Sequence, residues 1–157
     1  MRLTRFTDYS LRVLIYLAAS PERRATIAEI AAAFDIKQNH LTKVVQFLGQ
    51  EGFVATLRGK GGGLMLKRAA QAIIVGDVVR KAEGTDLPAE CFDRTNNTCS
   101  IARICRLRKV LQRATDAFYA VLDECTLAEL STNGRAIALT LGIGRIAAMP
   151  TARAAHA

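Results

Sequence analysis

Three of the four cysteines fall within one polar segment, CFDRTNNTCSIARIC, which runs from Cys91 to Cys105. Seven residues separate Cys91 from Cys99, and five separate Cys99 from Cys105. The segment is too polar and irregular to form core, and clustered thiols in a chain that is not secreted are more often metal ligands or redox centres than structural bridges. The spacing therefore predicts a metal or cluster site, or a labile disulfide.

The residues alone leave three chemistries open at these cysteines. Structural zinc needs four Cys or His ligands, commonly in close pairs such as CxxC. The segment has no such pair, and the only histidines are His40 and His156, so zinc lacks a convincing fourth ligand. Iron–sulfur clusters are held by more widely spaced thiolates, and a non-cysteine ligand can complete the set. A reversible disulfide between two of the cysteines is the third alternative.

A long helix is expected directly after these cysteines, from about residue 101 to 124. Its apolar residues form one stripe: Ile104, Leu107, Val110, Leu111, Ala114, Phe118, Val121 and Leu122. A stripe of this length needs a partner, and the same helix of a second copy would give a homodimer with two-fold symmetry, suited to a palindromic DNA site. Cys125 continues the stripe and is expected to be a small buried hydrophobe.

Upstream, two short helices around a tight turn predict a helix-turn-helix. They follow a first helix over residues 4–19, in which Asp8 and Arg12 form an i,i+4 ion pair. Thr26 and Glu29 form a capping box that opens the next helix. The following helix spans about residues 38–50 and buries its apolar side. Its polar side carries four residues expected to meet base edges in the major groove: Gln38, Asn39, His40 and Lys43.

Two β-prone runs, 53–57 and 64–67, follow and are joined by RGKGGG. Four glycines in five positions from Gly59 permit a tight hairpin tip, and Arg58 and Lys60 give it positive charge for DNA phosphates. A nucleotide-binding phosphate loop is the competing interpretation, but the segment lacks GKS/T and a strand-to-helix setting. A helix over residues 73–83, ended by Gly84, is expected to pack on this unit.

These elements predict a mainly α chain with a winged helix-turn-helix. The expected organisation is a DNA-binding domain over residues 1–84, a cysteine loop over 85–105, a dimerisation helix over 106–130 and a flexible tail over 131–157. The formal net charge of +8 implies an acidic partner, nucleic acid or an anionic membrane surface. Apolar runs are too short for a membrane span, and the N-terminus resembles a secretion signal only loosely, so a cytoplasmic location is expected. The chain has no nucleophile–His–acid set and no paired acidic motif, so an enzyme is not expected.

Four stretches together resemble a known family: MRLTRFTDYSLRVLIYLA, NHLTKVVQFLGQEGFVATLRGKGGGLML, GDVVRKAEG and CRLRKVLQRATDAFYAVLDECTLAEL. They are similar to the winged-helix iron–sulfur repressors, and most of all to their nitrite-sensitive, nitric-oxide-sensing branch, over about residues 1 to 130. The resemblance implies a dimeric repressor whose [4Fe–4S] or [2Fe–2S] cluster is destroyed by nitric oxide. Loss of the cluster then relieves repression of genes for nitric oxide detoxification.

The resemblance also implies a ligand set. The three cluster cysteines of the family fall on Cys91, Cys99 and Cys105, and the fourth ligand of the nitric-oxide-sensing branch, an aspartate from the partner subunit, falls on Asp8. The cysteine-desulfurase regulators of the family instead have a histidine shortly after the third cysteine, which this chain lacks. The first cysteine gap is longer than is usual in the branch, but loop insertions cost little closure entropy. A cluster-free thiol-redox or zinc-dependent winged-helix regulator stays as the alternative.

Overall fold

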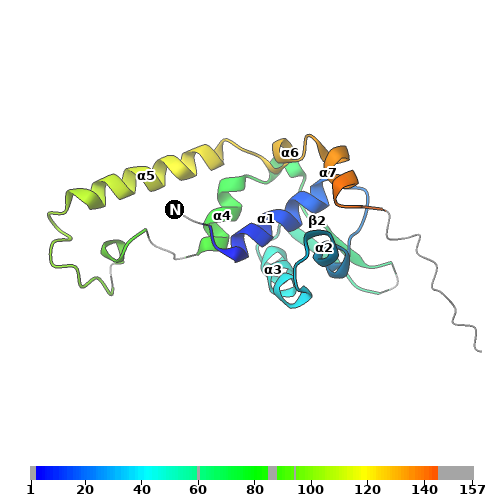
Figure 1. The fold of residues 1–157 in the computed structure, drawn as a ribbon, viewed down its shortest axis with the longest axis horizontal. Coiled ribbons are helices and arrows are strands. Elements are labelled where there is room, and N and C mark those ends of the chain that lie inside the picture. Colours follow the sequence, from blue (N-terminus) through cyan, green and yellow to red (C-terminus); the bar gives the residue numbers. More distant parts are fainter. Residues whose placement is uncertain (1–2, 60, 85–87, 94, 145–157) are drawn as a thin grey trace, which may run out of the picture.

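A computed structural model describes residues 3–59, 61–84, 88–93 and 95–144. One long helix, α5, projects from a helical body that contains a small hairpin (Figure 1). The elements in order are α1 (Arg5–Ala18), α2 (Ile27–Phe34), α3 (Gln38–Gln50), β1 (Val54–Leu57), β2 (Gly63–Leu66), η1 (Ala70–Ala72), α4 (Val75–Glu83), η2 (Glu90–Phe92), α5 (Arg106–Asp123), α6 (Leu127–Leu130) and α7 (Gly134–Thr140).

The core lies where α1 packs against α3 and α4 and where α2 packs against α3. Residues at helical spacing face inward from each helix, so that Leu14 of α1 and Leu41 of α3 are fully buried. The Thr26 side chain caps α2 and Glu29 bonds back to the Thr26 amide, which confirms the predicted capping box. After α2, Asp35 takes a left-handed backbone conformation with φ 52°, which turns the chain into α3. The predicted helix-turn-helix is confirmed.

The hairpin pairs β1 with β2 in antiparallel register from Val54 opposite Leu66 to Leu57 opposite Gly63. Ala25, just before α2, extends this sheet: its amide donates to the Leu64 carbonyl at 3.0 Å and its carbonyl accepts from the Leu64 amide at 2.7 Å. Hairpin and helix-turn-helix thus form one unit. The predicted fold, a mainly α winged helix-turn-helix, is confirmed.

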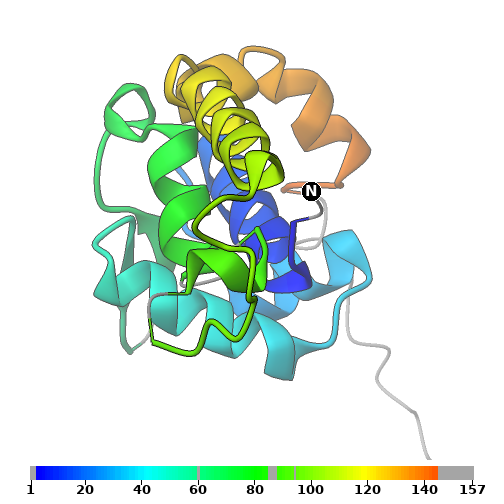
Figure 2. The ribbon, with the colours of Figure 1, turned by 90° about the vertical axis from the view of Figure 1, so that its left-hand side faces the viewer.

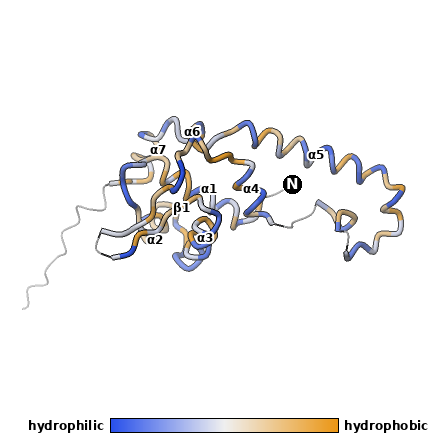
Figure 3. Tube along the Cα trace, turned by 180° about the vertical axis from the view of Figure 1, so that it is seen from behind, coloured by the Kyte–Doolittle hydropathy of each residue, from blue (hydrophilic) through white to orange (hydrophobic). Residues whose placement is uncertain are grey.

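The long helix α5 begins at Arg106, five residues later than expected, because residues 101–104 form turns and Cys105 is the N-cap. Viewed nearly along its axis, α5 lies beside α4 (Figure 2). Hydrophobic and hydrophilic residues alternate along its whole projecting length (Figure 3). None of its eighteen residues, all within the described ranges, is fully buried.

The segment expected to be a flexible tail contains a helix in its described part. Here α7 packs on α1, and Leu141 and Ile143 lie half-buried against the core. Gly134 of α7 lies directly against the end of α1, where a Cβ would make an ordinary van der Waals contact with the Cα of Ala19 at 3.4 Å. Residues 145–157 of the expected tail lie outside the described residues. No helix in the described part of the chain is both long and apolar enough to span a membrane.

Candidate nucleic-acid interface and cysteine loop

One face of α3 carries the residues that the sequence assigns to the major groove. Gln38, Asn39, His40 and Lys43 are all exposed, whereas the opposite face buries Leu41, Val44, Val45 and Leu48. The helical period thus puts the four polar side chains on the solvent side of the helix-turn-helix. Whether they touch DNA stays a prediction.

Although His40 is exposed, its side chain contacts a neighbouring helix. Its ring stacks on Tyr9 of α1, with ring centroids 6.4 Å apart and planes inclined by 19°. Phe6 of α1 packs edge-on against Phe47 of α3 at 5.1 Å. The start of α1 therefore holds α3 through two aromatic contacts. Neither pair has a local sequence signal, because both join residues more than thirty positions apart.

The hairpin tip has the conformation its glycines permit. Gly59 and Gly61 have φ of 91° and 80°, in the region that residues with a Cβ rarely adopt. Arg58 is exposed at the end of β1. Lys60, the other residue assigned to DNA phosphates, lies outside the described residues.

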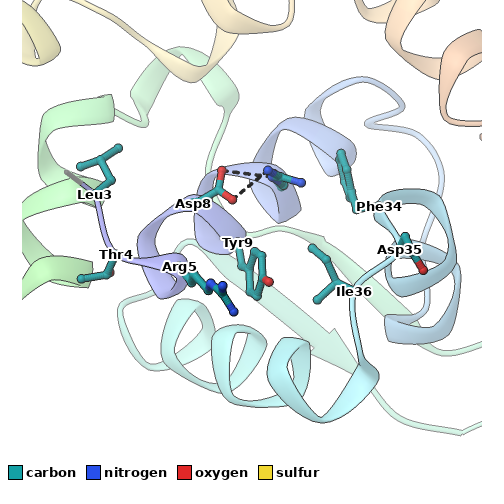
Figure 4. Close-up of a pocket in the computed structure, with 9 residues that line it drawn as sticks. Leu3, Thr4, Arg5, Asp8, Tyr9, Phe34, Asp35 and Ile36 are labelled. Atoms are coloured by element: carbon teal, nitrogen blue, oxygen red, sulfur yellow. Dashed lines mark hydrogen bonds and ion pairs between the residues drawn. The ribbon is translucent and has the colours of Figure 1, made fainter.

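Asp8 lies in the first turn of α1, at the edge of a hollow of about 650 Å³ (Figure 4). The hollow is lined by Leu3, Thr4, Arg5, Asp8, Tyr9, Arg12, Phe34, Asp35 and Ile36. The Asp8 carboxylate, 43% exposed, accepts from Arg12 Nη2 at 2.8 Å and from Arg12 Nε at 3.0 Å. The expected i,i+4 pair is confirmed, and the carboxylate of Asp8 faces an open hollow.

The cysteine loop lies at the far end of α5 from the body (Figure 1). Cys91 sits in η2, Cys99 in an irregular stretch and Cys105 at the N-cap of α5. All three are half-buried free thiols. Within the described ranges, no three His, Cys, Asp or Glu side chains come close enough to hold one metal ion. A single chain in this conformation therefore does not bring Cys91, Cys99, Cys105 and Asp8 together.

Two acidic side chains bind the segment between Cys91 and Cys99: Glu90, which lies just before the segment, and Asp93 within it. Glu90 Oε1 accepts from the Thr98 amide at 2.7 Å and from its hydroxyl at 2.5 Å, and the Thr98 hydrogen bonds lower the pKa of Glu90. Asp93 accepts from the hydroxyl and amide of Thr95 and from the Asn96 amide, and these bonds lower its pKa to about 2. Thr95, Asn96 and Thr98 of the longer gap are thus held by hydrogen bonds to Asp93 and Glu90.

One contact joins the cysteine loop to α5, and another joins the end of α4 to the start of α1. The Arg108 guanidinium of α5 lies 5.5 Å from the centre of the Phe92 ring, next to Cys91. Glu83, the last residue of α4, accepts from the amide and hydroxyl of Thr4 at 2.9 and 3.2 Å, so it caps α1 one turn before Asp8. The end of α4, from which the chain enters the cysteine loop, is therefore hydrogen-bonded to the start of α1, the helix that carries Asp8.

Cys125 departs from its expected position. Because α5 ends at Asp123, Cys125 lies in the following turn and is half-buried rather than fully buried. Its carbonyl accepts from the Val75 amide at 2.9 Å, so its backbone joins this turn to the start of α4.

The stripe on α5 is open to solvent in the single chain. Leu107, Val110 and Val121 are more than half exposed. A hollow of about 450 Å³ opens between Pro88 and the helix, lined by Leu111, Ala114, Thr115 and Phe118. An exposed apolar face of this length is typical of an interaction surface.

Comparison with known proteins gives this arrangement a family. A sequence model of the Rrf2 family, described as iron-dependent transcriptional regulator, matches residues 3–133. The NsrR transcriptional regulator of Bacillus subtilis (strain 168) is 48% identical over 134 residues, which covers 85% of this chain and 92% of the relative. The NsrR regulator of Geobacillus kaustophilus (strain HTA426) is 45% identical over 131 residues, covering 83% and 89%.

Solved structures agree with the fold. CymR of B. subtilis, titled the global cysteine regulator, superposes with a TM-score of 0.68 at 28% identity, covering 85% of this chain and 98% of that one. IscR of T. potens superposes with a TM-score of 0.69 at 24% identity, covering 85% and 88%. The family match spans most of the chain and several relatives exceed 40% identity, and the chain therefore belongs to the Rrf2 family of transcriptional regulators.

Proposed function

We propose that this chain is a DNA-binding repressor that works as a homodimer, carries an iron–sulfur cluster on Cys91, Cys99 and Cys105, and releases its operator in response to nitric oxide. The observation that carries the proposal is the set of three free, half-buried thiols on one loop, at the far end of a helix on which the side chains of Leu107, Val110 and Val121 are more than half exposed. The NsrR relatives, at 40–48% identity, support the same assignment.

The DNA-binding part of the proposal rests on two surfaces of one packed unit, the helix-turn-helix with its hairpin. The exposed side of α3 offers amides, an imidazole and an ammonium group, which suit base edges in the major groove. The wing adds Arg58 and Lys60 for the DNA backbone. A net charge of +8 favours association with a polyanion. A palindromic operator follows if two copies bind with two-fold symmetry.

The homodimer follows from the exposed face of α5. Leu107, Val110 and Val121 would lose their exposure if the same helix of a second copy packed on them. Two copies would also complete the ligand set, with three cysteines from one chain and Asp8 from the other. Asp8 suits this role because its carboxylate is part-exposed and faces an open hollow.

The donor set fits an iron–sulfur cluster in its chemistry. Three thiols without disulfide partners supply thiolates, and a carboxylate supplies a weaker oxygen ligand. When bound, the cluster, [4Fe–4S] or [2Fe–2S], would supply iron able to bind nitric oxide. The chain's own residues give a route from this loop to the recognition helix. Glu83, the last residue of α4 before the loop, accepts from the Thr4 amide at the start of α1, and Tyr9 of α1 stacks on His40 of α3.

The protein would act in the cytoplasm, where thiols stay reduced and the operator is accessible. The genes controlled would serve nitric oxide detoxification, and the protein would regulate rather than catalyse. These finer assignments rest on the similarity to the NsrR regulators.

The test is purification without oxygen, followed by an absorbance spectrum, iron and sulfide counts, and gel shifts with upstream DNA before and after nitric oxide. We expect a coloured protein whose DNA complex dissociates on treatment. Cys99→Ser should lose the colour, whereas Cys125→Ser, which changes a free thiol outside the loop, should keep it. A colourless wild-type protein with unaltered DNA binding would reject the cluster in favour of a thiol-redox or zinc-dependent regulator, which metal analysis and thiol counts separate.

A further inference from the structure

The tip of the wing has few means of holding its own shape. The β ladder ends at Leu57 opposite Gly63. Beyond it, glycines supply no side chains that could pack, and the Gly62 amide donates to the Gly59 carbonyl at 2.9 Å to close the turn. A glycine-rich tip of this kind loses more conformational entropy on ordering than other residues would.

A side chain from outside the hairpin reaches this tip. Arg24, in the segment before α2, donates from Nη1 to the Gly61 carbonyl at 2.7 Å. The two residues are 37 positions apart, and the guanidinium is exposed beside the wing. The bond therefore ties the tip to the body of the domain at a point that the β ladder does not reach.

The backbone that carries Arg24 is itself fixed. Its neighbour Ala25 exchanges two hydrogen bonds with Leu64 of β2. Gly63, with φ of 151°, leaves room for this approach, since a Cβ on it would lie 3.1 Å from the Cβ of Arg24. Arg24 thus extends from a backbone segment that is hydrogen-bonded to β2 towards the glycine-rich tip.

We propose that Arg24 is a positioning residue for DNA binding: through the Gly61 carbonyl, it holds the wing tip in the orientation in which Arg58 meets the DNA backbone. This rests on the proposed function in one respect, that the wing contacts DNA. A guanidinium so placed could instead bind a phosphate directly, and the two roles have different consequences.

Four full-length variants test the proposal: Arg24→Gln, Arg58→Gln, their combination, and Arg135→Gln as a control that removes the same charge from the exposed surface of α7. Binding to a random-sequence DNA duplex is measured by fluorescence anisotropy over a range of salt concentrations. Amide exchange of the free proteins is followed at Gly62. We expect Arg24→Gln to weaken binding about threefold to tenfold relative to Arg135→Gln, the range of one hydrogen bond, and to speed exchange at Gly62.

The combination separates positioning from direct contact. If Arg24 acts through the wing, its loss costs less once Arg58 is gone, because coupled residues are not additive. Three results would each overturn the proposal. Arg24→Gln could bind DNA as tightly as Arg135→Gln, or its Gly62 amide could exchange as in the wild type. The losses of Arg24→Gln and Arg58→Gln could also be additive, with a shallower salt dependence. If Arg58→Gln instead binds DNA as tightly as the wild type, the wing is not part of the DNA interface. That result would overturn both the positioning role of Arg24 and the proposed contact between the wing and DNA.

Discussion

Arg80 of α4 donates to both carboxylate oxygens of Asp123, the last residue of α5, with Nη1–Oδ1 at 2.7 Å and Nη2–Oδ2 at 2.5 Å. The same guanidinium lies 4.6 Å from the centre of the Tyr119 ring. Beside this pair, the Val75 amide donates to the Cys125 carbonyl and the Leu127 amide to the Ile73 carbonyl, both at 2.9 Å. Because no residue of α5, a fully described helix, is buried, these contacts fix the direction in which it leaves the body.

Arg80→Gln should loosen this attachment. The Arg80 hydrogen bond lowers the pKa of Asp123, so the charged pair contributes above the usual pKa of an aspartate and is lost as pH falls through the lowered value. We expect protection of the Val75 and Leu127 amides against exchange to drop about twofold to fivefold near neutral pH, the range for exposed ion pairs. The difference from wild type should vanish in acid. A difference that persists in acid would mean that the ion pair does not anchor α5.

Gly76 of α4 makes room for the same pair, because a Cβ there would overlap the Asp123 carboxylate. In most helices, Gly→Ala raises the free energy of unfolding by about 1 kcal/mol. We expect Gly76→Ala to gain little in the wild type, since the carboxylate must move away from Arg80. In an Asp123→Ala background, the same change should gain close to the full amount, as measured by urea unfolding. Equal gains in both backgrounds would contradict the steric explanation.

The sequence predicted those parts of the fold whose signals are local. The capping box at Thr26 and the apolar spacing of α3 depend only on residues within one helix, and both elements form where expected. The apolar period of α5 continues back to Ile101 and Ile104 and so predicts a start before Arg106, although these two residues lie in turns that precede the helix. The stability of α7 comes from packing on α1, and its weak periodicity gave no sign of that contact.

The candidate site was less accessible to sequence reasoning. Spacing selected Cys91, Cys99 and Cys105 as chemically active, but the positions of their thiols depend on how one loop folds and on a second copy of the chain. The aromatic stack of Tyr9 on His40 and the bond from Arg24 to Gly61 join distant segments through single contacts. Neither produces periodicity or a motif, so only the folded chain reveals them.

Thr26→Ala should destabilise the helix-turn-helix by about 0.5–2 kcal/mol, the usual cost of a lost N-cap, measured by urea unfolding.

The effect of pH separates the two halves of the capping box. Burial alone would raise the pKa of Glu29, but hydrogen bonds from the Thr26 amide and Arg23 more than offset this, so its pKa is lowered. The ionised Glu29 carboxylate therefore stabilises the folded protein above the usual pKa of a glutamate, and this stabilisation is lost as pH falls through the lowered pKa of Glu29. Glu29→Gln should therefore be destabilised at neutral pH and approach the wild type in acid, whereas Glu22→Gln, an exposed control, should show no such convergence.

Asp8→Ala and Arg12→Gln together distinguish a ligand from an ion pair. The side chains of the pair are 43% and 42% exposed, so either change should alter the free energy of unfolding of the iron-free protein by less than about 1 kcal/mol. Only Asp8→Ala removes the carboxylate proposed to complete the ligand set. In protein purified without oxygen, we expect Asp8→Ala to lose its visible absorbance in air several times faster than the wild type, while Arg12→Gln retains it. Similar decay in both variants would assign Asp8 to the surface pair alone, because Arg12→Gln breaks that pair and leaves the carboxylate in place.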